Sequence, residues 1–485
     1  MNPISMADLL PLVPESFLLG SVCVLLLADL FLSQSQRAVT HWLAIAVLLL
    51  TAALVCRVNG DDSLAGSAFG GMFVNDGVAA ISKIFMLITT ALVFVYAKPY
   101  LIPRKLFQGE FYTLILFAVL GMMFLASAGN TLTAYLGLEL LALPSYALVA
   151  LDRDNPRSSE AAIKYFVLGA MASGMLLYGI SMIYGATGSL DFASIRGALV
   201  SNVPHPGLQT FGLVFIVIGI AFKFGAAPFH MWVPDVYQGA PTPVTMFIGS
   251  APKIAAFALA YRLLEDALAP LFNDWSGMLA VLALLSLVIG NLVALAQTNL
   301  KRMLAYSTIS HVGFLLLGFI AGTAEGYAAA LFYAISYAIT ATASFGLIVF
   351  MSRAGFEAEE IDDFRGLNQR NGWYALLVLL VMASLAGVPL FVGFLAKLQV
   401  LKAAVGSGML PLALIAGVFA VIGAFYYLRV IKVVYFDQPL PSTQLVMPAD
   451  LPFRIALSVN CLALVALGIF GGPLMSWCLR AVTGG

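Results

Sequence analysis

Five ionisable residues lie inside long apolar runs, where the sequence gives them no obvious contact with water. Glu139 lies in AYLGLELLALP, Lys223 in VIGIAFKFGAAP and Lys253 in FIGSAPKIAAF. Lys397 lies in LFVGFLAKLQVL, and His311 lies in AYSTISHVGFLLL. A lysine or an acid at the centre of a membrane helix costs roughly 2.5–3.5 kcal/mol. Residues that cost this much in such runs indicate a function.

Proton transfer is the chemistry that these residue types suit. Loss of water disfavours a charged amine, and a neighbouring carboxylate favours it, so a small movement of one partner changes the protonation of the other. Arginine stays protonated in proteins and cannot act in this way. The deep cations of this sequence are all lysines. We therefore predict that the glutamate and the three lysines carry protons, with His311 on the same route.

Each of these residues also has a purely structural alternative. A lysine near a helix end can extend its amine to the membrane surface, and this alternative applies more to Lys397 than to the other deep lysines. A structural ion pair is the other form of this alternative. For Lys83 and Lys164, which are close to the starts of their helices, surface extension and a buried role are about equally expected. A histidine in mid-helix can be a hydrogen-bonded interior residue, so both roles stay open for His311. His230 is expected at an interface or in a relay rather than as a metal ligand.

The composition indicates a membrane protein that is helical throughout. Of 485 residues, 61% are hydrophobic and 10% are charged, with a mean hydropathy of +0.98, whereas soluble domains have about 25% charged residues. The apolar runs are about 20 residues long, enough for a helix to cross a bilayer, and lack the alternation of a barrel. We predict an all-α polytopic fold of about fourteen transmembrane helices. They are expected near 12–32, 41–57, 78–97, 111–128, 131–151, 161–186, 208–230, 243–264, 277–298, 303–322, 326–352, 374–402, 409–432 and 451–478.

The spacing of the deep residues predicts an internal duplication. Lys223 and Lys397 are 174 residues apart, and Glu139 and His311 are 172 apart, which maps helix five onto helix ten and helix seven onto helix twelve. A shift of five helices inverts the second copy, an arrangement that recurs in transporters together with broken helices. Prolines beside the lysines predict breaks in helices 7, 8 and 12. The predicted parts of the single transmembrane domain (1–485) are helices 1–3 (1–110), a first repeat (111–264), a second repeat (277–436) and helix 14 (451–478).

The basic residues predict the orientation of the chain. Lysine and arginine collect in cytoplasmic connections. Connections after odd-numbered helices contain thirteen of them, and the other connections with the C-terminal tail contain five. Both termini are therefore expected on the periplasmic side. The first apolar run has no basic segment before it, so it is expected to remain as a helix rather than to be cleaved as a signal peptide.

No cofactor site is visible in the sequence. There is no Walker A or GxGxxG loop, and none of the four cysteines forms a CxxC pair. We expect the cysteines to pack in apolar surroundings and the chain to hold no metal or cofactor. Energy must then come from an ion gradient or from a partner that performs redox chemistry.

Three segments carry a family resemblance. They are FKFGAAPFHMWVPDVYQGAPTPVT (222–245), SSEAAIKYFVLGA (158–170) and KRMLAYSTISHVG (301–313). They resemble signatures of the antiporter-like membrane subunits of respiratory complex I, a superfamily that includes multisubunit cation/proton antiporters and membrane-bound hydrogenases. Three further features resemble one of the three sister subunits in particular. These are the N-terminal run PESFLLGSVCVLLLADLF, a lysine at 397 where one sister usually has glutamate, and a length without the C-terminal arm of another.

The resemblance implies a role for each deep residue. Glu139 and Lys223 would be the carboxylate–lysine pair of one half-channel, Lys253 the connecting lysine and Lys397 the lysine of the second half-channel. His311 would belong to the polar axis between them. FMN, iron–sulfur clusters and quinone would reside in partner subunits.

The resemblance also implies a location and partners. The chain would be a non-redox, proton-translocating subunit of an NADH:quinone oxidoreductase in a bacterial inner membrane. It would contact sister antiporter-like subunits and lipid but no nucleic acid, and it would not be catalytic alone. A subunit of a cation/proton antiporter complex is the alternative, and a self-sufficient secondary transporter is a more distant one.

Overall fold

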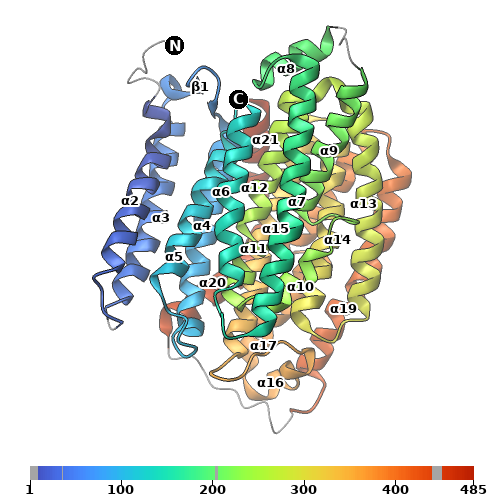
Figure 1. Cartoon of the computed structure of the whole chain (residues 1–485). Helices are drawn as coiled ribbons and strands as arrows, with labels where there is room; N and C mark the ends of the chain where they lie inside the picture. Colours follow the sequence, from blue (N-terminus) through green and yellow to red (C-terminus); the bar gives the residue numbers. More distant parts are fainter. Residues whose placement is uncertain (1–8, 35, 202–205, 440–449, 485) are drawn as a thin grey trace.

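A computed structural model of the chain describes residues 9–34, 36–201, 206–439 and 450–484. It is a bundle of helices (Figure 1), in which α2 begins and α21 ends on the same side, the upper side in the view. Within the described residues, thirteen helices are long and apolar enough to cross a membrane. The prediction of an all-α membrane fold is confirmed. The expected twelfth span, 374–402, is not among the thirteen because it is divided into two helices of 15 residues each.

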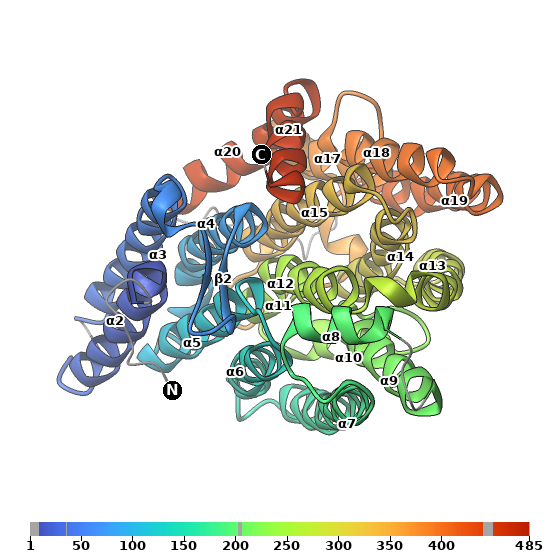
Figure 2. The same cartoon turned by 90° about the horizontal axis from the view of Figure 1, so that it is seen from above.

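The N-terminal helices lie at one edge of the bundle. The elements are η1 (Leu10–Leu12), α2 (Val13–Asp29), α3 (Ala38–Asn59), η2 (Asp62–Leu64), β1 (Gly66–Ala68), β2 (Phe73–Asn75) and α4 (Gly77–Leu101). Seen from above, α2 and α3 are peripheral, whereas α4 lies against the centre (Figure 2). The short antiparallel hairpin of β1 and β2 was not expected from the sequence.

The next group of helices contains two interruptions. Its elements are α5 (Gly109–Ala126), α6 (Thr131–Val149), α7 (Pro156–Thr187), α8 (Phe192–Val200), α9 (Pro206–Phe224), α10 (Trp232–Gly239), α11 (Thr242–Gly249), α12 (Ala251–Tyr261) and η3 (Arg262–Ala267). The helix expected at 208–230 already stops at Phe224, because Gly225 adopts a φ of 78° and so closes the helix with a left-handed residue. A second interruption at Ser250 separates α11 from α12.

The last group contains a third interruption. Its elements are η4 (Ala269–Leu271), α13 (Phe272–Leu295), α14 (Leu300–Ile320), α15 (Ala324–Met351), η5 (Ile361–Phe364), α16 (Leu367–Arg370), α17 (Gly372–Ala386), α18 (Val392–Gly406), α19 (Leu410–Tyr435), α20 (Leu451–Ile469) and α21 (Gly472–Thr483). Gly387, with a φ of 85°, ends α17. The prediction of one helix over 451–478 is wrong. The chain breaks before Gly472 and Pro473, and α21 packs on α4 and α15.

Two isolated backbone bridges recur at a constant spacing. Asn130, which caps α6, pairs with Asp191 before α8, and Asn299, which caps α14, pairs with Glu360 before η5. Both members of the second bridge follow those of the first by 169 residues. The first bridge is next to α8 on the upper side of Figure 1, and the second precedes α16 on the lower side.

The same spacing relates two close helix crossings. A Cβ atom added at Gly121 of α5 would lie 2.5 Å from the backbone nitrogen of Leu141 in α6. A Cβ atom added at Gly290 of α13 would lie 2.5 Å from the backbone nitrogen of Ser310 in α14. Each residue of the second crossing again follows its counterpart by 169 positions. Glycine is required at both crossings because the backbones approach so closely.

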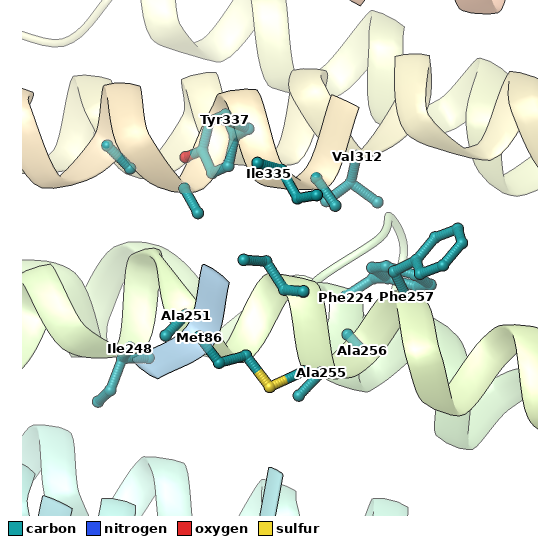
Figure 3. Close-up of a cluster of buried hydrophobic side chains, with 14 of the residues drawn as sticks. Met86, Phe224, Ile248, Ala251, Ala255, Ala256, Phe257, Val312, Ile335 and Tyr337 are labelled. Atoms are coloured by element: carbon teal, nitrogen blue, oxygen red, sulfur yellow. The ribbon is translucent and has the colours of Figure 1, made fainter. Parts of the chain in front are cut away.

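The centre of the bundle is apolar and tightly packed. Figure 3 shows Ala251, Ala255 and Ala256 of α12 between Met86 of α4 and the α15 residues Ile335 and Tyr337. These side chains are at most 9% exposed. A charged side chain placed among them can be stabilised only by polar groups inside the protein.

A buried clamp on the upper side joins α4, α5 and η3. Arg262 was expected in a connection, but it is 2% exposed and donates to both carboxylate oxygens of Asp76 at 2.7 and 2.8 Å. It also donates to Asp266 at 2.8 Å and to the Ala126 carbonyl at 2.9 and 3.0 Å. Burial opposes ionisation of Asp76, but Arg262 holds the pKa of that carboxyl below its usual value. A permanently charged arginine fits this fixed bidentate arrangement.

Candidate functional site

Glu139 of α6 and Lys223 of α9 lie near each other. Both are half-buried, and the charge of Glu139 acts on the Lys223 amine. One carboxylate oxygen of Glu139, Oε1, is buried and has no hydrogen-bond partner among the described residues. Buried polar atoms are almost always hydrogen-bonded, so an unpartnered oxygen is unusual and is common at functional sites.

Lys253 of α12 is held by the end of a broken helix. Its side chain is 3% exposed, and Nζ donates to the carbonyl oxygen of Phe224, the last residue of α9, at 2.7 Å. The amine also lies 5.4 Å from the ring centre of Trp232, and the charge of Lys223 acts on it. Unpaired carbonyls at a helix C-terminus carry partial negative charge, which stabilises a cation there.

Lys397 of α18 has the same environment at the third interruption. Its Nζ donates to the carbonyls of Leu385 and Ala386, the last residues of α17, at 2.9 and 3.1 Å. An aromatic face, that of Phe314, lies 5.3 Å away. The environment of Lys397 therefore differs from that of Lys223, with which its spacing paired it. Lys223 precedes its helix break and Lys397 follows its own, so Lys253 has the environment that matches Lys397.

His311 of α14 lies among hydroxyl groups between these two lysines. Its Nδ1 is 2.6 Å from the Tyr333 hydroxyl, and its Nε2 is 3.2 Å from the Tyr427 hydroxyl. Both ring nitrogens therefore have a partner that can donate or accept a hydrogen bond. The charge of Lys397 acts on the ring. His311 is thus an interior hydrogen-bonded residue and also a neighbour of the deep cations.

Two small cavities flank His311. Lys253, Thr308, His311 and Tyr337 line the first, and His311, Ser336 and Ser384 line the second with Leu385. Each has about 10 Å³ open to a water-sized sphere, close to the space that one water molecule needs. The hydroxyls of Ser336 and Ser384 are buried without a hydrogen-bond partner in the described structure. Apolar side chains form most of the walls of both cavities, but polar groups of Lys253, Thr308 and His311 line the first, and His311, Ser336 and Ser384 line the second. The cavities lie between Lys253, His311 and Leu385, whose carbonyl holds Lys397.

These contacts place the five predicted residues in one series. We call it the charged axis: Glu139, Lys223, Lys253, His311 and Lys397. The helices α6, α12, α14 and α18 follow one another across the bundle in Figure 2. The axis therefore passes through the apolar core from one edge of the bundle towards the other.

The sequence analysis missed the neutral members of this site. Tyr333, Ser336, Tyr337 and Thr340 all come from α15, at positions i, i+3, i+4 and i+7. This spacing places them on one helix face, which was a visible signal for a polar stripe. Tyr427 gave no such signal, because it lies in a short aromatic pair on α19.

The ambiguous residues have different environments. Lys83 does not reach the surface but pairs with Glu15 at 2.6 Å, with both side chains at most 3% exposed. Lys164 is 43% exposed and pairs with Glu160 and Asp235 at 2.8 Å each. His230 is half-buried, and within the described residues no group of three His, Cys, Asp or Glu could hold a metal ion.

Comparison with known proteins decides the family. The family described as "NADH:quinone oxidoreductase/Mrp antiporter, TM" matches residues 128–423. An "NADH-quinone oxidoreductase subunit N" from Xanthomonas euvesicatoria pv. vesicatoria is 56% identical over 486 residues, covering 100% of this chain and 98% of the relative. The protein of the same name from Thioalkalivibrio sulfidiphilus is 53% identical, covering 98% of both chains.

The chain belongs to the subunit N family of NADH-quinone oxidoreductase. It is therefore a multi-pass membrane subunit of a bacterial proton-pumping complex I, whose redox cofactors belong to other subunits. A chain of respiratory complex I from Thermus thermophilus is similar in structure, with a TM-score of 0.81 and 32% identity over 96% of this chain and 99% of that chain. The resemblance seen in the sequence is confirmed, and the antiporter alternative is not supported by these relatives.

Proposed function

We propose that the charged axis carries protons through subunit N and that redox chemistry in partner subunits drives them. One observation carries the proposal. Two cavities of water size flank His311 inside the core, one lined by Lys253 and the other by Leu385, whose carbonyl holds Lys397. A structural ion pair would not need such cavities, and Lys253 and Lys397 are held by neutral carbonyls instead of by carboxylates.

The geometry supports transfer in steps. The Glu139 carboxylate stabilises a proton on Lys223, so protonation or movement of Glu139 releases that proton towards Lys253. Two neighbouring ammonium groups repel each other, and Lys223 and Lys253 are close enough to interact. His311 can accept a proton at one ring nitrogen and release one from the other, with tyrosine hydroxyls at both. A proton on Lys253 can then reach Lys397 through the two cavities.

We infer further that 111–264 and 277–436 are inverted copies of a five-helix unit, flanked by 1–110 and 451–478. Support comes from the bridges and crossings that recur at 169 residues and from the opposite sides on which the two bridges lie. This spacing aligns Glu139 with Thr308 rather than with His311. The second copy thus lacks an acid at the equivalent position, and Lys397 depends on helix carbonyls alone.

We also propose an orientation in the bacterial inner membrane. The lower side of Figure 1 carries α16 and the connections rich in lysine and arginine, which favours a cytoplasmic location. Both termini would then be periplasmic. The exposed apolar side chains along α2, α3, α7 and α19 provide surfaces for lipid and for sister antiporter-like subunits.

Lys223→Ala tests the function in the assembled complex. We expect assembly to persist while NADH-linked proton pumping and quinone reduction fall together in membrane vesicles. Lys223→Arg should impair pumping as well, because arginine keeps the charge but does not release the proton. Normal pumping by the fully assembled Lys223→Ala complex would refute the proposed role.

A further inference from the structure

A polar cavity of about 370 Å³ opens on the proposed cytoplasmic side, apart from the charged axis. Its walls come from the end of α4, the start of α7, the connection between α10 and α11, the start of α14 and residues 355–359. We call this cavity the vestibule. Its charged lining residues are Arg104, Asp152, Arg157, Lys301, Glu357 and Glu359.

The inner wall of the vestibule holds a carboxylate and a buried amine. Glu357 accepts hydrogen bonds from Tyr100 at 2.8 Å, from Arg104 at 2.9 Å and from the Thr242 hydroxyl. Lys301 is 2% exposed, and its Nζ lies 3.9 Å from Glu357 and donates to the Ala240 carbonyl at 2.8 Å. The amine is thus enclosed, while the carboxylate is 24% exposed. This arrangement places one titratable oxygen between the cavity and the interior.

A buried tyrosine lies between this wall and the charged axis. Tyr237 of α10 is fully buried, and its hydroxyl has no partner of hydrogen-bonding geometry in the described part of the chain. Thr308 lies near that hydroxyl without a hydrogen bond of good geometry to it. Thr308 hydrogen-bonds to Tyr337 at 2.6 Å and lines the cavity of Lys253. Gly249 leaves space beside it, since a Cβ there would lie 3.1 Å from the hydroxyl oxygen.

Helices α14 and α11 connect the vestibule with the cavity that Lys253 lines. Lys301 and Thr308 lie seven residues apart on α14, so they share a helix face about two turns apart. Thr242 and Thr245 lie at the start of α11, and Thr245 donates to the backbone carbonyl of Tyr237. Polar groups therefore extend from the vestibule to the first cavity, whereas the surrounding core is apolar.

We propose that the vestibule is the cytoplasmic proton-uptake site of subunit N, with Glu357 as acceptor and Tyr237 as its link to Lys253. This inference rests on the proposed function and orientation. A proton from vestibule water binds to the Glu357 carboxylate and then passes to water at the Tyr237 hydroxyl. From there it binds to the neutral amine of Lys253, and Glu357 is again a carboxylate.

Substitution of Glu357 is the first test. In assembled complex I, Glu357→Gln should lower NADH-linked pumping about tenfold, because a positioned acid–base group contributes about 10²-fold or more to a proton transfer and other water can replace it in part. Glu357→Asp, which keeps a carboxylate, should restore most of the rate. Glu359→Gln is the matched control, since Glu359 lines the same cavity but pairs at 3.4 Å with the exposed Arg157. Equal pumping by the two glutamine variants would overturn the proposal.

Tyr237→Phe tests the inner link and decides the question if Glu357→Gln does not assemble. We expect slower pumping in the assembled complex, because only one hydroxyl is lost. Tyr96→Phe is the control, as Tyr96 is also fully buried but donates to Ala456 at 3.1 Å, away from the route. If Tyr237→Phe pumps like Tyr96→Phe, the link is wrong.

The side from which the vestibule opens can be tested by labelling. Arg157 is 72% exposed at the rim, so Arg157→Cys should react with a bulky membrane-impermeant thiol reagent in inside-out vesicles and lose pumping. In right-side-out vesicles treated with the same reagent, the Arg157→Cys complex should keep its pumping. The wild-type complex, treated in the same way, is the control. Inactivation only from the periplasmic face would overturn the uptake site. If Lys223→Ala is inactive while Glu357→Gln and Tyr237→Phe pump normally, this inference fails and the proposed function stands.

Discussion

The buried cations of this chain fall into two classes that differ in what surrounds them. Arg262 faces two carboxylates and a carbonyl and is fully paired. Lys253 and Lys397 face only neutral carbonyls and aromatic rings. A charged group with weak neutral partners can lose its proton at a lower energetic cost than one inside an ion pair. This difference separates Arg262, which fixes the fold, from Lys253 and Lys397, which can carry a proton.

Substitution of Glu139 tests the carboxylate at the start of the axis. Glu139→Gln removes the charge that stabilises the proton on Lys223, so pumping should fall about tenfold, within the contribution typical of a positioned acid–base group. Glu139→Asp keeps the charge and should cause a smaller loss. Glu110→Gln is a suitable control because Glu110 is exposed at the start of α5. A glutamine variant as active as this control would remove Glu139 from the route.

At the scale of single residues, the sequence is most informative for ionisable residues within apolar runs. Glu139 and the lysines of the axis could be predicted because an ionisable residue in a long apolar run has a visible cost. Neutral hydroxyls such as Ser336 carry little cost and were missed. Arg262 was placed in a connection because its partner Asp76 is 186 positions away, and no local pattern reveals such a pairing.

Interrupted helices create the binding positions for the axis lysines. A continuous helix would bond the carbonyls of Phe224 and Ala386 internally, whereas α9 and α17 stop in glycines with left-handed backbone and leave them to Lys253 and Lys397. The end of each interrupted helix therefore supplies a carbonyl oxygen as the hydrogen-bond acceptor of the lysine amine, in place of a water molecule. We regard the break, rather than an opposing charge, as the feature that lets a lysine remain in the core.

Gly387→Ala tests this dependence on the break. A side chain in the left-handed conformation costs roughly 1–2 kcal/mol, and the added Cβ would lie 3.2 Å from the Lys397 amine. We expect a lower thermal stability of the complex and slower pumping. Gly417→Ala in α19, where a Cβ meets nothing within 4 Å, should change neither property adversely. Equal behaviour of the two variants would contradict the role of the break.

The existence of the helices could be predicted from the sequence better than the residues at which they begin and end. The apolar runs locate most spans, but Pro228 suggested a break that begins at Gly225, and the run over 451–478 conceals the turn before α21. The duplication was inferred from charged residues, which gave 172 and 174 instead of the 169 of the backbone bridges. The charged residues lie at different positions in the two proposed copies, so the distance between them does not give the repeat length.

The whole molecule has one charged axis and two unlike faces. The proposed orientation predicts which loops each compartment can reach. Ser63→Cys, exposed on the upper side, should react with an impermeant thiol reagent in right-side-out vesicles, and Lys105→Cys, exposed on the lower side, should react only in inside-out vesicles. The reverse pattern would invert the orientation and place the vestibule in the periplasm.

The way in which the helices pack against one another could not be predicted from composition and periodicity. Contacts such as those of Lys301 with Ala240 or Arg104 with Glu357 join segments 61 and 253 residues apart. The family resemblance supplied the overall fold, and the structure supplied the vestibule and the hydroxyls around His311. Both follow from how distant helices meet, which a single sequence does not encode in local patterns.

Lys253 is the point through which both halves of the axis must communicate, so its substitution tests the central claim most directly. The measurements are the rate of proton pumping and the rate of NADH-linked quinone reduction by vesicles with the assembled Lys253→Met complex. Lys98→Met, at the membrane edge beside Asp450, is the control. We predict that Lys253→Met loses pumping and quinone reduction together while Lys98→Met keeps both. Normal proton pumping by the Lys253→Met complex would contradict a proton route along the charged axis.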